Sequence, residues 1–361
     1  MQYRYTRREV ATLALGAATP LAGCLGGSAT SEGSSARTDT APPPRRGPPT
    51  ADRSPYLAYD RRRLRENVVS GGVPKDGIPA VDDPQFVDAS AASLRDEDIV
   101  FGVLRGGAAT AYPRKLLVHH EIVNDRLDRV PVSVTYCPLT GTAMGFERGD
   151  TSFGVSGDLV NSNLLMYDRA TDSRWPQMLA TAISGPLAGQ SLREFGLVWT
   201  TWERWRGRHP GTRVLSEDTG YVRNYGVDPY GSYGPKRGYY ARDSTMYSPL
   251  ATDDRLGAKA VVVGVRTDRG AAAVTHARLR RRGLVTLSVG DDRILVVHDP
   301  DLDAAYGYRP SAGADVSATA DGVAVDGTTH PPASLPFERH PAVEAMWFAW
   351  AGFYPGTALH A

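Results

Sequence analysis

The chain has 361 residues, of which 41 are basic and 40 acidic, so its formal net charge at pH 7 is +1. This balance leaves no basic excess, and the composition therefore predicts no nucleic-acid partner. With 41% hydrophobic residues, the chain has enough apolar sequence for one large or two ordinary domains with a sizeable core, which excludes a disordered protein.

The first 23 residues have the pattern of an export signal. A twin-arginine pair, Arg7-Arg8, precedes a short apolar run at 10–21 that is too short to span a bilayer as a helix. The run ends in Leu21-Ala22-Gly23-Cys24, which resembles a lipobox in which Cys24 is lipidated and becomes the first mature residue. We therefore expect a protein held by lipid on the extracytoplasmic face of the membrane. The alternative is an ordinary secretory signal with an incidental cysteine.

The next 32 positions, residues 24–55, are mostly Gly, Ser, Ala, Thr and Pro, with a proline-rich stretch at 41–49. No apolar periodicity is present in this segment. Such a composition is typical of a disordered or polyproline-like tether, so we expect globular sequence from residue 56 onward.

The globular part contains an internal repeat. Three pairs of similar segments are displaced by 162 positions: 101–109 and 263–271, 134–138 and 296–300, 143–146 and 305–308. Two pairs of tryptophans are displaced by 145 positions: Trp202 and Trp347, Trp205 and Trp350. Constant offsets predict an internal duplication, with a first half at 56–215 and a second half at 216–361. Cys137 of the first half corresponds to Asp299 of the second.

Each half is predicted to contain several short strands followed by one helix. Alternating apolar residues between Gly-rich turns indicate strands. Tryptophans at 199, 202 and 205 recur at helical spacing before a Pro-Gly pair, with capping-box spacing at 200–203, and 343–350 shows a similar apolar face. These patterns predict a Trp-bearing amphipathic helix closing each half, whose stripe is buried rather than stacked on a ligand. The predicted fold class is α+β, mainly β.

The segment 132–143 contains Cys137, the cysteine that remains for chemistry if Cys24 carries lipid. Alternating residues from Val132 to Tyr136 predict a half-buried strand, and Pro138 and Gly141 predict a turn after it. Cys137 is thus expected at a strand end, where a rigid scaffold can present a reactive thiol. The alternative is an inert, buried cysteine.

Two histidines and two acidic residues precede this strand: His119, His120, Glu121 and Asp125. A thiolate with imidazole and carboxylate neighbours suits copper, zinc or iron, and the candidate ligands are His120, Glu121, Asp125 and Cys137. The same groups can instead activate a nucleophilic Cys137 with His120 as its base. The spacing matches neither Cys-x-x-Cys nor His-Glu-x-x-His.

The alternative is that these residues have only a structural role. Histidines near strands mostly satisfy neighbouring polar groups, and Asn124-Asp125 first of all indicates a turn. If a turn at 124–129 pairs Val123 with Val130, His120 lies about 13 Å along the strand from Cys137. The chain must then bend or pair differently for these side chains to converge.

Several motifs in order resemble the domain of unknown function 3179 (DUF3179) family. They are found at 120–125, 134–139, 153–157, 161–168, 175 and 347–350. The resemblance covers roughly residues 56–359 and implies an exported bacterial or archaeal protein without a settled activity. The family's usual Cys-Pro-x-Cys pattern would imply redox or metal chemistry. Here Thr140 occupies the second position, so a two-thiol cycle or a Cys-x-x-Cys metal site is not implied.

Three hypotheses for the function follow. The first is an extracytoplasmic lipoprotein that binds a metal ion or a small ligand at the Cys137 site. The second is a thiol oxidoreductase with a single-cysteine Cys-Pro-Leu-Thr motif. The third is a structural surface lipoprotein whose site has decayed. Binding is preferred, because loss of the second thiol harms a redox cycle more than a site with other ligands.

Overall fold

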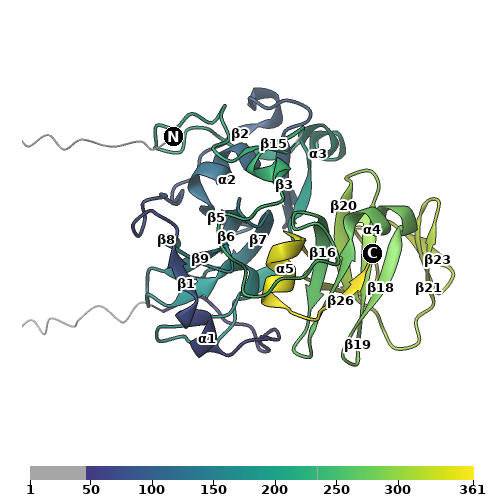
Figure 1. Cartoon of the computed structure of the whole chain (residues 1–361). Coiled ribbons are helices and arrows are strands. Elements are labelled where there is room, and N and C mark those ends of the chain that lie inside the picture. The colour runs from purple at the N-terminus through teal and green to yellow at the C-terminus, as the bar shows by residue number, and fades with distance from the viewer. Residues whose placement is uncertain (1–45, 234) are drawn as a thin grey trace, which may run out of the picture. The chain divides into compact units, whose positions relative to one another are not determined.

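Strands dominate the structure, a computed structural model that describes residues 46–233 and 235–361 (Figure 1). Strand residues make up 41% and helical residues 14%, which confirms the predicted α+β, mainly β class. The predicted signal peptide at 1–23, the lipidation site Cys24 and the first part of the tether lie outside the described residues. Within the described ranges, no helix is both long and apolar enough to cross a membrane.

The first half contains three sheets and three α-helices. One sheet has the order β12-β3-β4-β13-β2, with β12 (Val198–Thr201), β3 (Ile99–Arg105), β4 (Ala108–Pro113), β13 (Arg213–Leu215) and β2 (Phe86–Asp88). A second has the order β11-β7-β6-β5, with β11 (Glu194–Phe195), β7 (Thr142–Glu147), β6 (Val130–Cys137) and β5 (Ile122–Leu127). The third has the order β1-β8-β9-β10, with β1 (Val68–Ser70), β8 (Phe153–Val160), β9 (Asn163–Asp168) and β10 (Arg174–Pro176). The helices are α1 (Arg61–Glu66), α2 (Arg114–His120) and α3 (Trp202–Arg208).

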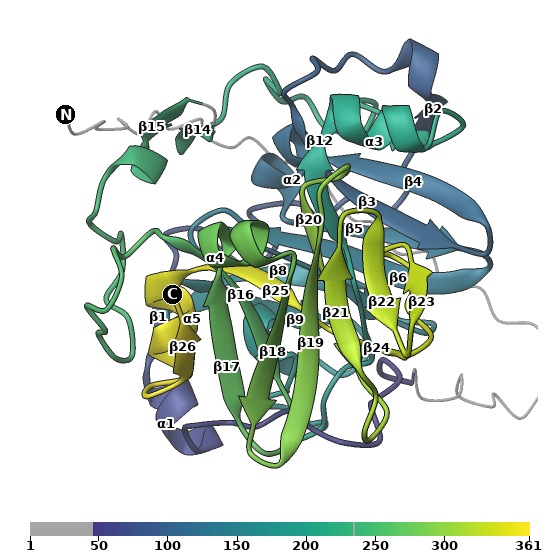
Figure 2. The same cartoon turned by 90° about the vertical axis from the view of Figure 1, so that its right-hand side faces the viewer.

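From residue 261 onward, the second half repeats two of these sheets and adds a smaller one. The order β25-β16-β17-β26 joins β25 (Val343–Met346), β16 (Val261–Arg266), β17 (Ala271–Thr275) and β26 (Ala358–His360). The order β18-β19-β20-β24 joins β18 (Leu284–Val289), β19 (Asp292–Asp299), β20 (Ala304–Arg309) and β24 (Glu338–His340). The added sheet joins β21 (Val316–Thr319), β22 (Gly322–Val325) and β23 (Thr328–His330), and the helices are α4 (His276–Arg282) and α5 (Trp347–Phe353). Figure 2 shows β17, β18 and β19 side by side.

The two halves place a tryptophan on a glycine in the same way. A Cβ atom at Gly102 in β3 would lie 2.2 Å from the ring of Trp205, and one at Gly264 in β16 would lie 2.3 Å from the ring of Trp350. Each helix therefore packs against bare backbone. The order and pairing of the strands thus recur, whereas an origin by duplication stays a prediction.

The helices themselves differ from their prediction. Trp199 belongs to β12, where it pairs with Phe101 of β3, and the helix begins only at Trp202. The Thr200 hydroxyl donates to the carbonyl of Leu302, and the Thr201 side chain forms no capping bond. Instead, the amides of Trp202 and Glu203 donate to backbone carbonyls of residues 98 and 96. In the second half, residues 343–346 likewise form β25 rather than helix. The predicted capping box and the long stripes are therefore wrong, because strand pairing takes up the residues before each helix.

The folded part starts earlier than predicted. Thr50 forms a β-bridge with Leu192, and the amide of Ala51 donates to the carbonyl of Ser191 at 2.7 Å. Residues 46–55 therefore pack against the first half rather than continuing the tether.

The chain between the two repeated sets of strands, residues 216–260, is named here the covering segment. It contains β14 (Gly231–Tyr233) and β15 (Lys236–Gly238), besides a short 3-10 turn at Tyr239–Ala241. The Tyr239 hydroxyl donates to the carbonyl of Leu139 at 2.8 Å, and Ser162 Oγ donates to the carbonyl of Tyr247 at 3.0 Å. The sequence assigned the covering segment to the second half. It packs on the turn after Cys137 and on the β8–β9 turn of the first half, and also on α5 of the second half, where the Trp347 indole donates to the carbonyl of Asp253 at 3.0 Å.

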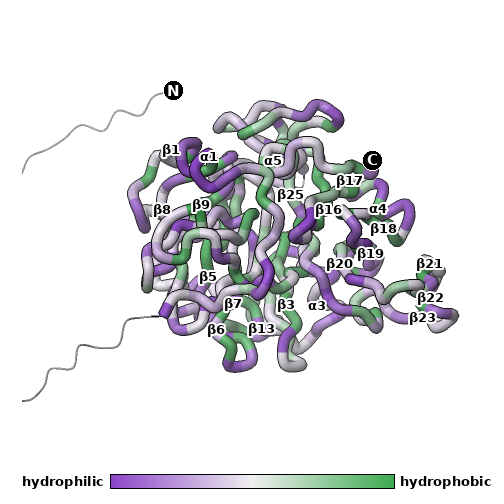
Figure 3. The backbone as a smooth tube through the Cα atoms, turned by 90° about the horizontal axis from the view of Figure 1, so that it is seen from below, coloured by the Kyte–Doolittle hydropathy of each residue, from purple (hydrophilic) through white to green (hydrophobic). Residues whose placement is uncertain are grey.

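Burial explains how β6 positions the site. The strand is buried from Val132 to Cys137, because β5 and β7 pair with its two edges and other elements pack on both faces of its sheet. Val134 and Tyr136 join the core cluster that contains residues of β3 and α2, whereas Cys137 joins the cluster that contains residues of β8 and β9. Figure 3 shows hydrophobic stretches along the strands and a hydrophilic α1. Cys137 therefore faces the β8–β9 hairpin.

Candidate functional site

Cys137 ends β6 and lies at a strand end, as predicted. Its side chain is only 1% exposed. The amide of Leu164 donates to Sγ at 3.4 Å, and the thiol donates to the carbonyl of Ser162 at 3.6 Å. Burial, followed by the nearby Glu121 carboxyl, raises the pKa of Cys137 to about 11, although contacts with Thr140 and the Leu164 amide lower it. The thiol therefore forms hydrogen bonds with backbone groups but is uncharged at neutral pH.

The pairing of β5 with β6 brings Glu121 next to this thiol. Val123 lies opposite Val134 rather than Val130, and the turn is formed by Asp128 and Arg129, which both have positive φ. The predicted turn at Asn124-Asp125 is wrong, because both residues lie in β5 and pair with β6. As a result, the amide of Tyr136 donates to the carbonyl of Glu121 at 2.8 Å.

His120 bonds to groups other than the cysteine. Its Nδ1 lies 2.8 Å from the carbonyl of Pro79 and its Nε2 lies 2.7 Å from the hydroxyl of Tyr225. Burial lowers its pKa, so the ring is neutral and has both nitrogens occupied. His120 is therefore not placed to act as the base of Cys137.

The four predicted metal ligands do not converge. Asp125 accepts a hydrogen bond from the hydroxyl of Tyr112 at 2.6 Å and another from the amide of Arg126, which leaves it committed to the sheet. In the described part of the chain, no group of three or more His, Cys, Asp or Glu side chains is arranged to hold a metal ion. The set of His120, Glu121, Asp125 and Cys137 thus does not fit copper, zinc or iron here.

Glu121 has an unusual backbone. It ends α2 in the left-handed conformation, with φ of 58°, a position where glycine or asparagine is preferred. The position 162 residues later is Gly283, which ends α4 with φ of 69°. For a residue with a side chain this conformation costs about 1–2 kcal/mol. The first half therefore keeps a glutamate where the same turn in the second half uses glycine.

Within residues 46–233 and 235–361 no protein group donates to the Glu121 carboxyl, which faces the cavity described below, although the residue is only 7% exposed. Burial raises its pKa to about 8. Its side chain lines a cavity of about 120 Å³, named here the Glu121 cavity. The other lining residues are Gly71, Val73, Ile78, Leu139, Val155, Gly157, Asp158, Leu159, Leu164, Tyr230, Met246 and Tyr247. A buried carboxyl without a partner, facing a cavity, is typical of a functional site.

A comparison with protein-family models matched residues 75–357 to a family described as "Protein of unknown function (DUF3179)". The chain belongs to the DUF3179 family. No curated protein and no solved structure matched it.

In this DUF3179 protein, sequence reasoning missed the aromatic wall of the cavity. Tyr230 and Tyr247 come from the covering segment, more than 90 positions after Cys137. Burial and then the charges of Glu121 and Cys137 raise the pKa of Tyr230, which places its phenol near both groups. The available signal was the concentration of seven tyrosines at 221–247.

Proposed function

We propose that this DUF3179 protein binds a small, positively charged ligand in the Glu121 cavity, while lipid on Cys24 holds it at the extracytoplasmic face of the membrane. The observation that supports binding is the Glu121 carboxyl, which is buried, strained in its backbone, and without a partner in the described residues. The support for the anchor is the sequence pattern at 1–24 alone.

The charge of the ligand follows from the groups around the cavity. Its lining includes the carboxyl groups of Glu121 and Asp158, and no Lys, Arg or His among the described residues that form it. Asp158 is ion-paired with Arg174 at 3.2 Å, so Glu121 is the acid that still lacks a partner. An anionic ligand would add repulsion, whereas a cation would restore the charge of Glu121 and gain from the tyrosine rings.

The size of the cavity limits the ligand. A protein cavity of about 150 Å³ accommodates benzene, so a cavity of about 120 Å³ accommodates a group of only a few heavy atoms. An alkylammonium ion or the ammonium end of a longer molecule meets both requirements. The ammonium nitrogen would donate to Glu121, and the carbon atoms would contact Val155, Leu159 and Leu164.

The two alternatives have less support. A thiol oxidoreductase needs an accessible thiolate, but Cys137 is buried from solvent and its pKa is raised to about 11. A purely structural protein does not need Glu121, because Gly283 ends α4 in the same conformation without burying a carboxyl.

The binding proposal is tested by titrating a series from methylammonium to hexylammonium into the full-length protein by calorimetry. An alkylammonium behaves like a lysine side chain, with a pKa of about 10.4, so it stays charged at pH 9. Glu121 is then ionised, and we expect tighter binding at pH 9 than at pH 6. Glu121→Gln should abolish binding at both values, while the matched Glu203→Gln on the exposed surface of α3 should not. If no ammonium ion binds, or if Glu121→Gln binds equally, the proposal fails.

A further inference from the structure

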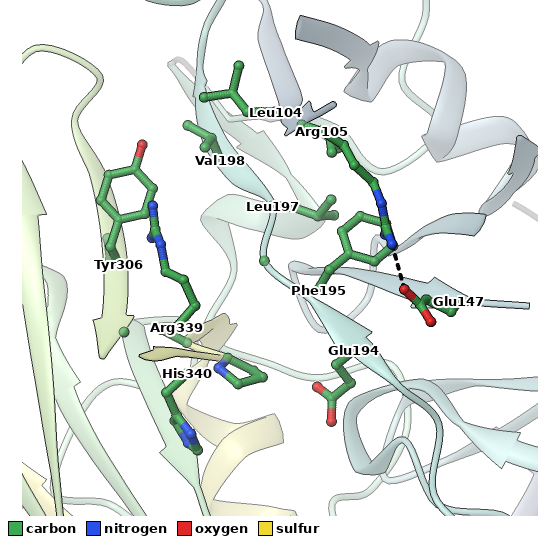
Figure 4. A pocket seen from close by; sticks show the side chains of 16 residues that line it. Leu104, Arg105, Glu147, Glu194, Phe195, Leu197, Val198, Tyr306, Arg339 and His340 are labelled. Carbon is green, nitrogen blue, oxygen red and sulfur yellow. Dashed lines mark hydrogen bonds and ion pairs between the residues drawn. The ribbon is translucent and has the colours of Figure 1, made fainter. Parts of the chain in front are cut away.

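A second cavity, of about 420 Å³, lies between strands of the two halves and is separate from the Glu121 cavity. We name it the Arg339 cavity. Figure 4 shows Tyr306 and Arg339 on one side of it, with Phe195 and Leu197 on the other. Its volume is within the range of about 300–1,000 Å³ that is common for small-molecule sites.

One wall of the Arg339 cavity is apolar. It is formed by Leu104, Phe195, Leu197 and Val198, and Leu104 is 51% exposed although it is a large hydrophobic residue. An apolar surface of this kind favours a ligand with a hydrocarbon body.

The carboxylates around this cavity are already neutralised. Glu147 pairs with Arg105 at 2.6 Å, and Glu194 pairs with the buried Arg266 at 2.9 Å. The His340 imidazole is neutral at pH 7, because burial lowers its pKa to about 4, and burial raises the pKa of the Tyr306 phenol, which is also uncharged. None of these groups has an unpaired charge that would attract a charged ligand.

Arg339 is different, because its guanidinium forms no ion pair with any residue in 46–233 or 235–361. The guanidinium lies over the ring of Tyr306 at 4.4 Å and over that of Tyr308 at 4.7 Å, and Nη2 donates to the carbonyl of Ala333. Stacking on two rings fixes the plane of the guanidinium, which prepares it for a bidentate contact with a carboxylate.

We propose that the Arg339 cavity binds a small amphipathic carboxylate. The carboxylate contacts Arg339, and the hydrocarbon body lies against Phe195, Leu197 and Val198. Since about 150 Å³ accommodates benzene, the cavity has room for a chain of roughly ten carbons. This site is independent of the one proposed at Glu121, since the two cavities share no lining residue.

Decanoate is the probe for this site, titrated by calorimetry into the full-length protein at pH 7. We expect saturable binding at one site. Decanol and decyltrimethylammonium, which have similar chains without a negative charge, should bind more weakly by about tenfold, the worth of one charge-assisted hydrogen bond.

Two variants test the contacts separately. Arg339→Gln should weaken decanoate binding by about tenfold or more, while Arg293→Gln, at an exposed position of β19 outside the cavity, should not. Gly196→Leu should weaken binding without changing charge, because Gly196 lines the cavity and a Cβ there meets no atom within 4 Å, which leaves the leucine side chain room to occupy.

The outcomes decide the proposal. It is overturned if decanoate does not bind, if decanol binds as well, or if either cavity variant binds like the wild type. Melting temperatures of the variants close to that of the wild type confirm that they are folded. Glu121→Gln should leave decanoate binding unchanged, so failure of the alkylammonium experiment would leave this result intact.

Discussion

Replacement of Glu121 by glutamine should change how the stability of the protein depends on pH. The folded state holds the pKa of Glu121 at about 8, against an ordinary value of 4.5, because the carboxyl is buried. Between these values the unfolded chain has released this proton and the folded chain has kept it. The unfolded state therefore binds fewer protons, and stability falls as pH rises toward and through 8.

The size of the effect follows from the shift. Each pKa unit corresponds to about 1.36 kcal/mol, so the wild type should lose about 4 kcal/mol of unfolding free energy at this group between pH 5 and pH 9. Glutamine does not titrate and removes this loss. The backbone strain at position 121 is the same in both proteins and cancels from the comparison.

The assay is urea unfolding followed by fluorescence of the six tryptophans, at pH values from 5 to 9. The difference in unfolding free energy between Glu121→Gln and wild type should grow by about 4 kcal/mol in favour of the variant across this range. The other titrating groups are shared and cancel, apart from Cys137 and Tyr230, whose pKa values are raised first by burial and then by Glu121. The exposed control Glu203→Gln should follow the wild type. A Glu121→Gln curve parallel to that of the wild type would refute the assignment of a raised pKa.

Three further predictions concern the anchor, the packing and the thiol. Cys24→Ser should move the protein from the membrane fraction to the soluble fraction or leave it uncleaved; normal processing with continued attachment, seen on blots, would contradict the lipobox. Gly102→Ala should destabilise the protein by about 1–3 kcal/mol, since its Cβ would lie 2.2 Å from the Trp205 ring. The control Gly196→Ala should leave stability unchanged, and a melting temperature of Gly102→Ala equal to that of the wild type would contradict the packing. Native Cys137 should react with a thiol reagent far more slowly than in urea, because it is 1% exposed; equal absorbance time courses would contradict its burial.

Much of the fold was predictable because strand patterns and turn residues are local signals. The strand over 132–137 and the turn after it are examples. The helix limits were not predictable in the same way. Trp199 has helical spacing with Trp202, yet its backbone pairs with Phe101, nearly 100 positions earlier. Pairing between distant segments overrides the local pattern.

The site was predictable only in part, for the same reason. Sequence placed Cys137 at a strand end and named Glu121 as a candidate, but as a metal ligand. The sequence predicted Asn124 to lie in a turn. In the structure its side chain donates hydrogen bonds to Asp82 and to the carbonyl of Phe153, which are 42 and 29 positions away. Without those contacts the register of β5 could not be chosen.

The two halves together show which features of the site the fold itself requires. In the second half, the position of Cys137 is held by Asp299, whose carboxyl accepts from the amides of residues 301 and 302 and so supports its own turn. The position of Glu121 is held there by Gly283, which adopts the left-handed conformation without strain. The same strand order thus forms with residues that serve only the backbone. Glu121, just before β5, lies near Cys137 at the end of β6, and neither residue supports its own turn as its counterpart does. The strained backbone and the buried carboxyl of Glu121 both cost folding free energy, and the repeated strand order does not require either of them. A cation bound beside Glu121 would offset this cost.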